Sequence, residues 1–330
     1  MRKLLLTGGC GLIGHAFVEH ILKNTDWEVI VLDKLNYASN GLNRLRDIKA
    51  FDENRVKVFT ADFTKHINDG LAQEIGQVDY ILHLGAETHV DNSIKDPEPF
   101  VMSNVLGTMH MLNFARTQKN LKKFLYFSTD EVFGPAPEGT DYKEWDRYNS
   151  GNPYAATKAG GEELALAWHN TYKVPVIITH TMNVYSERQH PEKFIPLCVN
   201  KIRNGEVIQI HANKDRTKSG SRMWIHARNV ADAVLFLLDK GKVGDKYNIV
   251  GEREQSNLEI AQRIAHVLEL PLQYEMVDFH SSRPGHDLRY SLSGAKLADM
   301  GWKPPLTFEE SFKKTILWMI DPDNKKWLIK

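Results

Sequence analysis

Tyr154 and Lys158 lie four positions apart in the chain. On an α-helix this spacing places both side chains on one face, and Pro153 suits the first turn of such a helix. A lysine ammonium beside a phenol stabilises the phenolate and lowers its pKa from the usual value of about 10. A phenolate can then take a hydroxyl proton while hydride leaves to a nicotinamide. Because the Tyr-x-x-x-Lys spacing is common by chance, this interpretation needs a dinucleotide-binding motif in the same chain.

A glycine-rich stretch near the N-terminus supplies that motif. Gly8, Gly11 and Gly14 follow a short apolar run and open a segment with helical periodicity. Glycines there allow the backbone to approach a pyrophosphate closely, and Cys10 in the same turn is expected to pack rather than to act as a nucleophile. Asp33 ends the next apolar run, where a carboxylate can bind a ribose diol and would repel a 2′-phosphate. The pattern favours NAD over NADP; the alternative is a plain turn with a strand-end aspartate.

Two adjacent carboxylates, Asp130 and Glu131, follow the apolar run 124–127 after Ser128 and Thr129. The carboxyl end of a strand is where a doubly wound fold carries its chemistry. Two carboxyl groups there can divide acid and base roles if their surroundings separate their pKa values. Alternatively, Ser128 and Glu131 have the spacing of a helix capping box. The residues alone leave both interpretations open.

These candidate groups sit at the ends of apolar runs that predict a parallel sheet. The runs lie at 4–7, 29–32, 56–59, 80–82, 124–127 and 176–178, and helical periodicity separates most of them. Such alternation implies βαβ units with right-handed crossovers. We therefore predict an α/β fold, a doubly wound parallel sheet of the Rossmann type with a smaller mixed α/β C-terminal substrate domain.

The regular alternation weakens after about residue 182. Residues 211–221 are polar and predict a loop, whereas later segments predict a strand at 247–250 and helices at 227–240, 257–268 and 306–320. We expect an NAD-binding domain over 1–182 plus roughly 222–250. The substrate domain would comprise 183–221 and 251–330, with a ligand cleft between the two domains.

The composition limits the class of protein, since 330 residues suggest about two domains. Lys plus Arg and Asp plus Glu both number 42, which disfavours a dedicated nucleic-acid binder. Two cysteines suit a reducing compartment, and no apolar run is long enough to span a membrane. The fourteen histidines show no tight metal-ligand spacing, so no metal site is expected. The apolar stretch at the N-terminus is too short for a signal peptide, so a cytoplasmic enzyme is expected.

Taken together, the motifs resemble those of the extended short-chain dehydrogenases/reductases that act on nucleotide sugars. The resemblance rests on the Gly8–Gly14 loop, the run Ser-Thr-Asp-Glu-Val-Phe-Gly at 128–134, and the Tyr154–Lys158 pair. The Thr-Asp-Glu triplet is the mark of the nucleoside-diphosphate-glucose 4,6-dehydratases, and related epimerases usually lack its carboxylates. Further stretches that resemble this family lie at 84–91, 152–160 and 283–290.

The resemblance implies roles for the residues at these motif positions. Tyr154 would deprotonate the C4 hydroxyl of the sugar as hydride passes to NAD, with Lys158 holding the cofactor ribose and tuning the phenol. Glu131 would remove the C5 proton, and Asp130 would be the protonated acid that helps the C6 hydroxyl to leave as water. Thr129 would hydrogen-bond near the C4 oxygen. Hydride would then return to C6, which leaves a 4-keto-6-deoxy sugar.

The resemblance also implies binding residues. For NAD they are Gly8, Gly11, Leu12, Ile13, Gly14, Asp33, Asp62, Phe63, Leu84, Ala86, Tyr154 and Lys158. For a nucleoside-diphosphate sugar they are Glu87, Thr88, Asn183, Lys193, Arg222, Asn257, Arg283 and His286. The guanidinium fork suits diphosphate oxygens, which favours Arg222 and Arg283 there. The alternative for these polar residues is a surface salt bridge or a loop hydrogen bond.

The chain departs from the family pattern in two places. It has Asn-Val-Tyr-Ser-Glu at 183–187 where Asn-Asn-Tyr-Gly-Pro is common, and Ser-Arg-Met-Trp at 221–224 where Val-Arg-Asp-Trp is common. We expect both stretches to lie in the region that selects the base and the sugar. The dTDP-, UDP-, CDP- and GDP-sugars, and an N-acetylated sugar, therefore stay open. The alternatives to a dehydratase are an epimerase or decarboxylase of the same superfamily, or an idle NAD-binding scaffold.

The resemblance further implies a homodimer. The helices expected near 100–118 and 154–172 match those that pair across the dimer in this superfamily. Met109, Leu112 and Phe114 on the first helix are either contacts in that interface or part of the core of one monomer.

Overall fold

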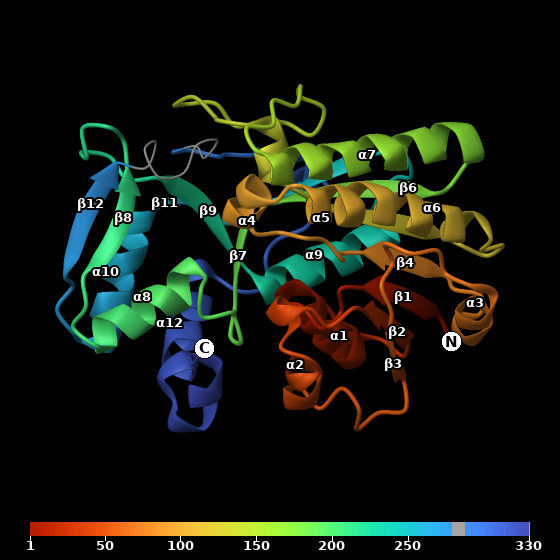
Figure 1. Cartoon of the computed structure of the whole chain (residues 1–330), viewed down its shortest axis with the longest axis horizontal. Helices are drawn as coiled ribbons and strands as arrows, with labels where there is room; N and C mark the ends of the chain where they lie inside the picture. The colour runs from red at the N-terminus through yellow and green to blue at the C-terminus, as the bar shows by residue number, and fades with distance from the viewer. Residues whose placement is uncertain (279–287, 330) are drawn as a thin grey trace.

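A sheet of seven parallel strands forms the centre of the residues that the computed structural model describes, 1–278 and 288–329 (Figure 1). The strands are β1 (Lys3–Thr7), β2 (Glu28–Asp33), β3 (Val56–Thr60), β4 (Tyr80–His83), β5 (Lys123–Thr129), β6 (Val176–Thr181) and β10 (Lys246–Ile249). They are paired in the order β10-β6-β5-β4-β1-β2-β3. The direction of winding reverses between β1 and β4, and doubly wound sheets bind dinucleotides at such a switch point. The predicted Rossmann sheet is confirmed.

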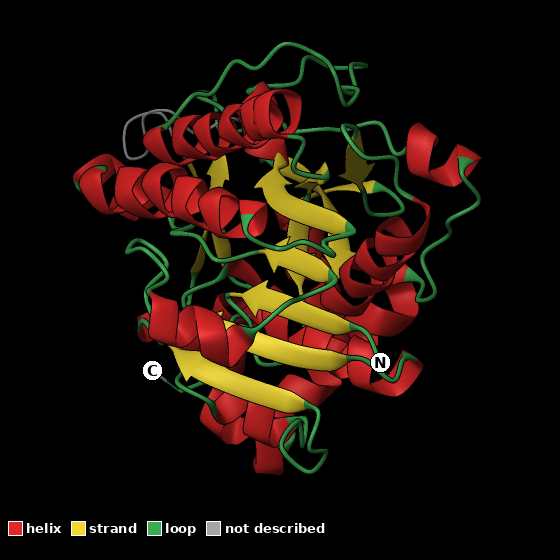
Figure 2. Ribbon diagram, turned by 90° about the vertical axis from the view of Figure 1, so that its right-hand side faces the viewer, coloured by secondary structure: helices red, strands yellow, loops and turns green. Residues whose placement is uncertain are grey.

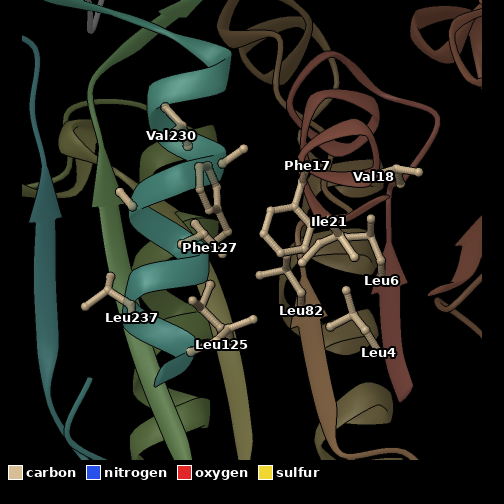
Figure 3. Close-up of a cluster of buried hydrophobic side chains, with 14 of the residues drawn as sticks. Leu4, Leu6, Phe17, Val18, Ile21, Leu82, Leu125, Phe127, Val230 and Leu237 are labelled. Atoms are coloured by element: carbon tan, nitrogen blue, oxygen red, sulfur yellow. The ribbon is translucent and has the colours of Figure 1, made fainter. Parts of the chain in front are cut away.

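Helices cover both faces of this sheet (Figure 2). On one face, α1 (Leu12–Asn24) and α9 (Ala227–Lys240) pack side by side over the strands. The contacts there include Leu4, Leu6, Leu125, Phe17 and Leu237 (Figure 3). Alternate strand residues point the opposite way, so strands covered on both faces need the nearly continuous apolar runs found in the sequence.

The other face is covered by α3 (Asp69–Ile75), α6 (Thr108–Arg116) and α7 (Pro153–Tyr172). Helix α6 continues from α5 (Glu98–Phe100) through a π-helical stretch, η2 (Val101–Gly107). Leu112 and Phe114 of α6 pack into this core together with Leu5 of β1 and Phe124 of β5. The helices predicted near 100–118 and 154–172 are therefore present.

A smaller group of elements follows β6 and lies to the left in Figure 1. Its strands are β7 (Asn183–Tyr185), β9 (Ser221–His226) and β11 (Glu254–Ser256) in one sheet, and β8 (Ile208–Ala212) and β12 (Tyr274–Asp278) in another. Strand β9 pairs parallel with β7 and antiparallel with β11. The helices α8 (Phe194–Arg203), α10 (Asn257–Leu268) and α12 (Phe308–Ile320) share a core with them. This agrees with the predicted smaller mixed α/β part.

Some predicted boundaries move in the structure. The polar run 211–221 is not one loop, because β8 extends to Ala212 and β9 begins at Ser221. Residues 247–250 contribute to β10, which joins the large sheet as expected. Strand β9 belongs to a small sheet, whereas the sequence predicts residues from about 222 to 250 in the cofactor domain. The division into two domains stays a prediction.

Short elements complete the fold. They are η1 (Tyr37–Ser39), α2 (Asn43–Asp47), α4 (Val90–Lys95), η3 (Asp130–Phe133), α11 (Ala295–Asp299) and η4 (Pro322–Trp327). Within the described part of the chain, no helix has the length and apolar character needed to cross a membrane.

Candidate active site

The glycine-rich loop between β1 and α1 makes a turn that only glycine allows. Gly8 has a φ of 73°, in the left-handed region. A Cβ atom on Gly14 would lie 2.2 Å from the carbonyl oxygen of Gly8, so the first turn of α1 approaches the end of β1 closely. Helix α1 begins at Leu12, and the backbone N–H groups of a helix N-terminus favour an anion.

Asp33 is held beside this loop at the end of β2. Its Oδ2 accepts a hydrogen bond from the Cys10 N–H at 2.9 Å, and its Oδ1 accepts one from the Leu35 N–H at 2.9 Å. Cys10 is fully buried, and burial together with the Asp33 carboxylate raises the pKa of its thiol to about 12. A thiol with so high a pKa is a poor nucleophile, which supports the expected packing role of Cys10.

A cavity of about 400 Å³ brings the glycine loop and the predicted catalytic residues together. Its walls include Gly8, Gly11, Leu12, Ile13, Gly14, Asp33, Phe63, Leu84, Ala86, Thr129, Asp130, Glu131, Tyr154 and Lys158. Asp62 is different: it is exposed, lies outside this lining, and its Oδ1 accepts a hydrogen bond from the Thr64 N–H at 2.9 Å. The close glycine turn and the anchored Asp33 carboxylate at this cavity fit a dinucleotide.

The Thr-Asp-Glu triplet begins inside strand β5. The strand runs through Thr129, two residues beyond the predicted apolar run, so Ser128 is extended and its hydroxyl donates to the carboxylate of Glu162 on α7. The side chain of Thr129 caps the following turn, η3, by accepting from the Glu131 N–H at 3.4 Å. The alternative of a capping box formed by Ser128 and Glu131 is therefore wrong.

Asp130 is buried and has one carboxyl oxygen available. Its Oδ1 accepts a hydrogen bond from the Thr129 hydroxyl at 2.9 Å. Its Oδ2 is buried with no hydrogen-bond partner among the described residues. Burial raises the pKa of this carboxyl group, although the nearby positive charge of Arg222 opposes the rise. A carboxyl group with a raised pKa keeps its proton to higher pH, as a general acid must.

Glu131 is oriented by a residue that our sequence analysis did not select. Its Oε2 accepts a hydrogen bond from Asn152 Nδ2 at 2.9 Å. The Oδ1 of Asn152 caps α7 by accepting from the Ala155 N–H at 2.9 Å. An Asn directly before Pro153 is a helix-start signal in the sequence, but its contact with Glu131 depends on how β5 and α7 pack.

Tyr154 and Lys158 occupy the first two turns of α7, which begins at Pro153 as predicted. The ammonium of Lys158 donates to the Phe127 carbonyl oxygen at 2.6 Å and lies 4.3 Å from the centre of the Tyr126 ring. Burial lowers the pKa of Lys158 to about 7.

The expected lowering of the Tyr154 pKa is not found in this structure. Burial raises the pKa of the phenol, the carboxylate of Glu131 raises it further, and a hydrogen bond with the Thr129 side chain opposes the rise. The prediction considered only the lysine, whereas a phenolate buried next to a carboxylate is disfavoured.

A second cavity of about 1050 Å³ adjoins the first. The predicted substrate residues Thr88, Asn183, Lys193, Arg222 and Asn257 line it, and it shares Glu131 with the first cavity.

Another substrate candidate does not line the second cavity. Glu87 lines only the first cavity, where its carboxylate pairs with Lys34 Nζ at 2.6 Å. Arg283 and His286 lie outside the described residues.

Arg222 combines a structural contact with its place in the second cavity. Its Nη1 donates to the carbonyl oxygens of Ser221 at 2.6 Å and Leu288 at 2.8 Å, and its guanidinium stacks 4.4 Å from the centre of the Tyr290 ring. These contacts hold the side chain in place at the cavity wall.

The first departure from the family pattern, at 183–187, lies only partly at the cavities, where Val184 lines the first. Among the described residues, Ser186 and Glu187 line neither of them. The Glu187 carboxylate is buried and pairs with His226 at 3.3 Å and Arg228 at 3.4 Å. The expectation that this stretch selects the base or sugar is therefore wrong for Ser186 and Glu187, because their side chains serve packing between elements. In the second stretch, Arg222 and Trp224, which agree with the family pattern, line the second cavity, whereas the departing residues Ser221 and Met223 line neither cavity.

No group of three or more His, Cys, Asp or Glu residues in the described part of the chain could hold a metal ion.

A sequence model of the NAD dependent epimerase/dehydratase family matches residues 4–250, well over half of the chain. The chain belongs to this family. Among its members, the dTDP-glucose 4,6-dehydratase of Salmonella typhimurium is 35% identical over 349 residues, which cover 99% of this chain and 94% of that protein.

Solved structures of family members share the fold. DesIV, a dTDP-glucose 4,6-dehydratase from Streptomyces venezuelae solved with NAD and TYD bound, is 34% identical with a TM-score of 0.88, covering 99% of this chain and 98% of that one. The UDP-glucose 4-epimerase of Thermus thermophilus, solved with NAD, is 25% identical with a TM-score of 0.85, covering 96% and 98%. Since dehydratases and epimerases of the family share this fold, the residues of the site must distinguish them.

Proposed function

We propose that this chain is an NAD-dependent nucleoside-diphosphate-sugar 4,6-dehydratase that forms a 4-keto-6-deoxy sugar from a substrate of the dTDP-glucose or UDP-glucose type. The observation that carries the proposal is the pair Asp130 and Glu131 in the same cavity as Tyr154 and Lys158. The similarity to dTDP-glucose 4,6-dehydratases over nearly the whole chain supports it.

The Gly8–Gly14 loop would bind the pyrophosphate of NAD, Asp33 the adenosine ribose, and Lys158 the nicotinamide ribose. Bound NAD would supply the hydride acceptor for C4 of the sugar and, once reduced, the hydride for C6, and its positive charge would favour a phenolate. The closeness of Gly8 to Gly14 and the anchored carboxylate of Asp33 support this assignment. Asp62, being exposed and outside the cavity, is a weaker candidate for the adenine side.

Tyr154 is the base for the C4 hydroxyl in this proposal. The Lys158 ammonium would favour the phenolate once substrate and cofactor are bound, and Thr129, which hydrogen-bonds with Tyr154, would hold the oxygen at C4. The raised pKa of the Tyr154 phenol means that proton removal depends on positive charge brought into the cavity.

Asp130 and Glu131 divide the elimination of water between them. Glu131 takes the proton from C5, which the new ketone at C4 makes acidic, and the electron pair forms a double bond between C5 and C6. The C6–oxygen bond breaks, and the leaving hydroxyl takes the proton of Asp130 and departs as water. When hydride is later added to C6, the proton held by Glu131 returns to C5. The hydrogen bond from Asn152 orients the base, and burial keeps the acid protonated.

The second cavity would hold the nucleoside diphosphate. Arg222 suits the diphosphate oxygens, with Thr88, Asn183, Lys193 and Asn257 on the same wall. Arg283 and His286 remain candidates on the family resemblance alone. In this arrangement the large sheet carries the cofactor, and the elements after β6 carry most of the nucleotide site.

A substrate panel tests the proposed function. The purified protein is incubated in turn with dTDP-, UDP-, CDP- and GDP-glucose and with an N-acetylated nucleotide sugar. Mass spectrometry then follows the product. We expect loss of one water and a 4-keto-6-deoxy sugar from at least one of them. A product that retains its C6 hydroxyl would indicate an epimerase or decarboxylase, and no product from any of them would contradict both assignments.

We also propose that the chain forms a homodimer through α6 and α7 and is located in the cytoplasm. Leu112 and Phe114 are buried within the monomer, so they are not the interface contacts that the sequence left open. Two exposed apolar side chains, Val101 of η2, which leads into α6, and Tyr172 of α7, support the proposal. Light scattering on the purified protein would show a dimer mass or a monomer mass.

A further inference from the structure

Arg44 is a buried arginine in the wall of the first cavity. It lies on α2, after the loop that follows Asp33, and only 1% of its surface is exposed. Within the described residues, no carboxylate forms an ion pair with it, although Asp33 is close enough to raise its pKa. Burial lowers the pKa of the guanidinium to about 10, so it stays charged at neutral pH.

Backbone carbonyl oxygens from three separate segments receive its hydrogen bonds. Nη1 donates to Cys10 at 3.1 Å, Ala38 at 2.8 Å and Ser39 at 2.7 Å. Nε donates to Arg188 at 3.0 Å. Cys10 belongs to the glycine loop, Ala38 and Ser39 to the loop after β2, and Arg188 to the segment between β7 and α8.

All three segments border the cavities. Cys10 accepts from Arg44 through its carbonyl oxygen and donates through its N–H to the carboxylate of Asp33. The segment that contains Arg188 continues to Lys193, which lines both cavities. A second contact supports the same connection, because Arg188 Nε donates to Asp47 Oδ2 at 2.6 Å at the end of α2.

We propose that Arg44 is a positioning residue that holds the dinucleotide-binding loops in their binding conformation and joins them to the segment leading to Lys193. A guanidinium is suited to this role because its rigid fork donates in several directions at once. Without it, buried carbonyl oxygens lose charged donors, the loops relax, and NAD binding must then order them. The inference rests on the proposed function only in taking NAD as the dinucleotide.

Arg55 offers a matched control. It donates to three backbone carbonyl oxygens, those of Thr25 at 2.8 Å, Trp27 at 3.2 Å and Leu22 at 2.9 Å, and it also pairs with the carboxylate of Glu53. These residues lie at the other end of β2, and Arg55 lines neither cavity. Arg55→Met therefore removes the same kind of contact away from the dinucleotide site.

The experiment compares Arg44→Met, Arg44→Lys and Arg55→Met with the unmodified protein. The measurements are the NAD content after purification, the rate of NAD loss on dialysis and the thermal unfolding temperature. We expect Arg44→Met to lose NAD about 10-fold faster or more, while Arg55→Met retains it at a comparable loss of stability. The rate of NAD loss from Arg44→Lys should lie between those of Arg44→Met and the unmodified protein, since one ammonium cannot reach all the carbonyl oxygens that Nε and Nη1 of the guanidinium contact. At saturating NAD the turnover of Arg44→Met should recover, because Arg44 does not touch the reacting atoms.

Two results would overturn the inference. One is NAD retention in Arg44→Met equal to that of the unmodified protein. The other is equal NAD loss in Arg55→Met, which would make the effect one of general stability. If Arg44→Met does not fold, the rates of NAD loss from Arg44→Lys and Arg55→Met are compared instead. Equal rates in these two variants would overturn the inference. An unmodified protein that does not bind NAD at all would contradict the proposed function instead.

Discussion

The side-chain amide of Asn152 caps helix α7 and holds Glu131 at the same time. Its Oδ1 accepts from the Ala155 N–H, and its Nδ2 donates to Glu131 Oε2, both at 2.9 Å. One side chain thus connects the helix that carries Tyr154 to the turn after β5 that carries Glu131. This contact therefore joins the elements that carry the two proposed bases.

Replacing Asn152 should separate its two roles. In Asn152→Ser the hydroxyl still caps α7 but is too short to reach Glu131, so stability should stay near that of the unmodified protein while dehydration slows about 10-fold or more. In Asn152→Ala the cap is lost as well, which costs about 1 kcal/mol of unfolding free energy. Denaturant unfolding and product formation measure the two effects. Unchanged turnover in Asn152→Ser would show that Glu131 does not depend on this contact.

Glu131→Gln should stop the reaction after oxidation at C4. The amide has nearly the same shape but cannot take the C5 proton, so product formation should fall by about 100-fold or more. Oxidation at C4 does not need this carboxylate, so the absorbance of the reduced nicotinamide should persist after substrate is added. Normal turnover in Glu131→Gln would show that another group is the C5 base.

Asp130→Asn should reduce activity and raise stability. The amide cannot supply a proton to the leaving hydroxyl, so dehydration should fall by about 100-fold. Because burial raises the pKa of Asp130 in the folded state, the folded protein binds more protons there than the unfolded chain above pH 3.8. The ionisation of Asp130 therefore lowers the free energy of unfolding as the pH rises, and the neutral amide of Asp130→Asn avoids this loss. A lower unfolding temperature for Asp130→Asn at neutral pH would contradict this account of the acid.

His83 should make the cofactor-binding sheet sensitive to acid. Burial lowers its pKa from 6.5 to about 3, and its neutral ring lies between the hydroxyls of Thr7 at 2.7 Å and Thr108 at 3.1 Å. The Thr108 hydroxyl donates to the Asn104 carbonyl oxygen, so it accepts from His83 and the ring proton lies on Nε2, which leaves Nδ1 to accept from the Thr7 hydroxyl. As the pH falls, His83 gains its second ring proton near pH 6.5 in the unfolded chain but only near pH 3 in the folded protein. The stability that is present above pH 6.5 is therefore lost as the pH falls toward about 3.

The variant His83→Gln tests this dependence. Its unfolding free energy should vary less with pH across that window, by about 1.4 kcal/mol per pH unit, the slope for one proton. Part of the dependence should remain, because burial also lowers the pKa of His15 to about 3. An unchanged slope in urea unfolding between these pH values would exclude His83 as a source of acid sensitivity.

Several parts of the site could be predicted because their signals are local. The spacing of Gly8 and Gly14 encodes a turn that a side chain would block, and Tyr154 and Lys158 share a helix face by periodicity alone. The ends of β5 and the role of Ser128 could not be predicted from such signals. Ser128 satisfies both strand and capping patterns, and its partner Glu162 is thirty-four residues away.

The sequence by itself determined the order of strands and helices up to about residue 182, the dinucleotide motif and the family, because these depend on residues close together in the chain. The tertiary structure decided the electrostatics and the positioning of the site. The pKa of Tyr154 is raised because burial and the charge of Glu131 outweigh what the helix spacing predicts. The contacts of Asn152 with Glu131 and of Arg44 with Arg188 join segments far apart in sequence. Such contacts arise only when the elements pack, so no local pattern encodes them.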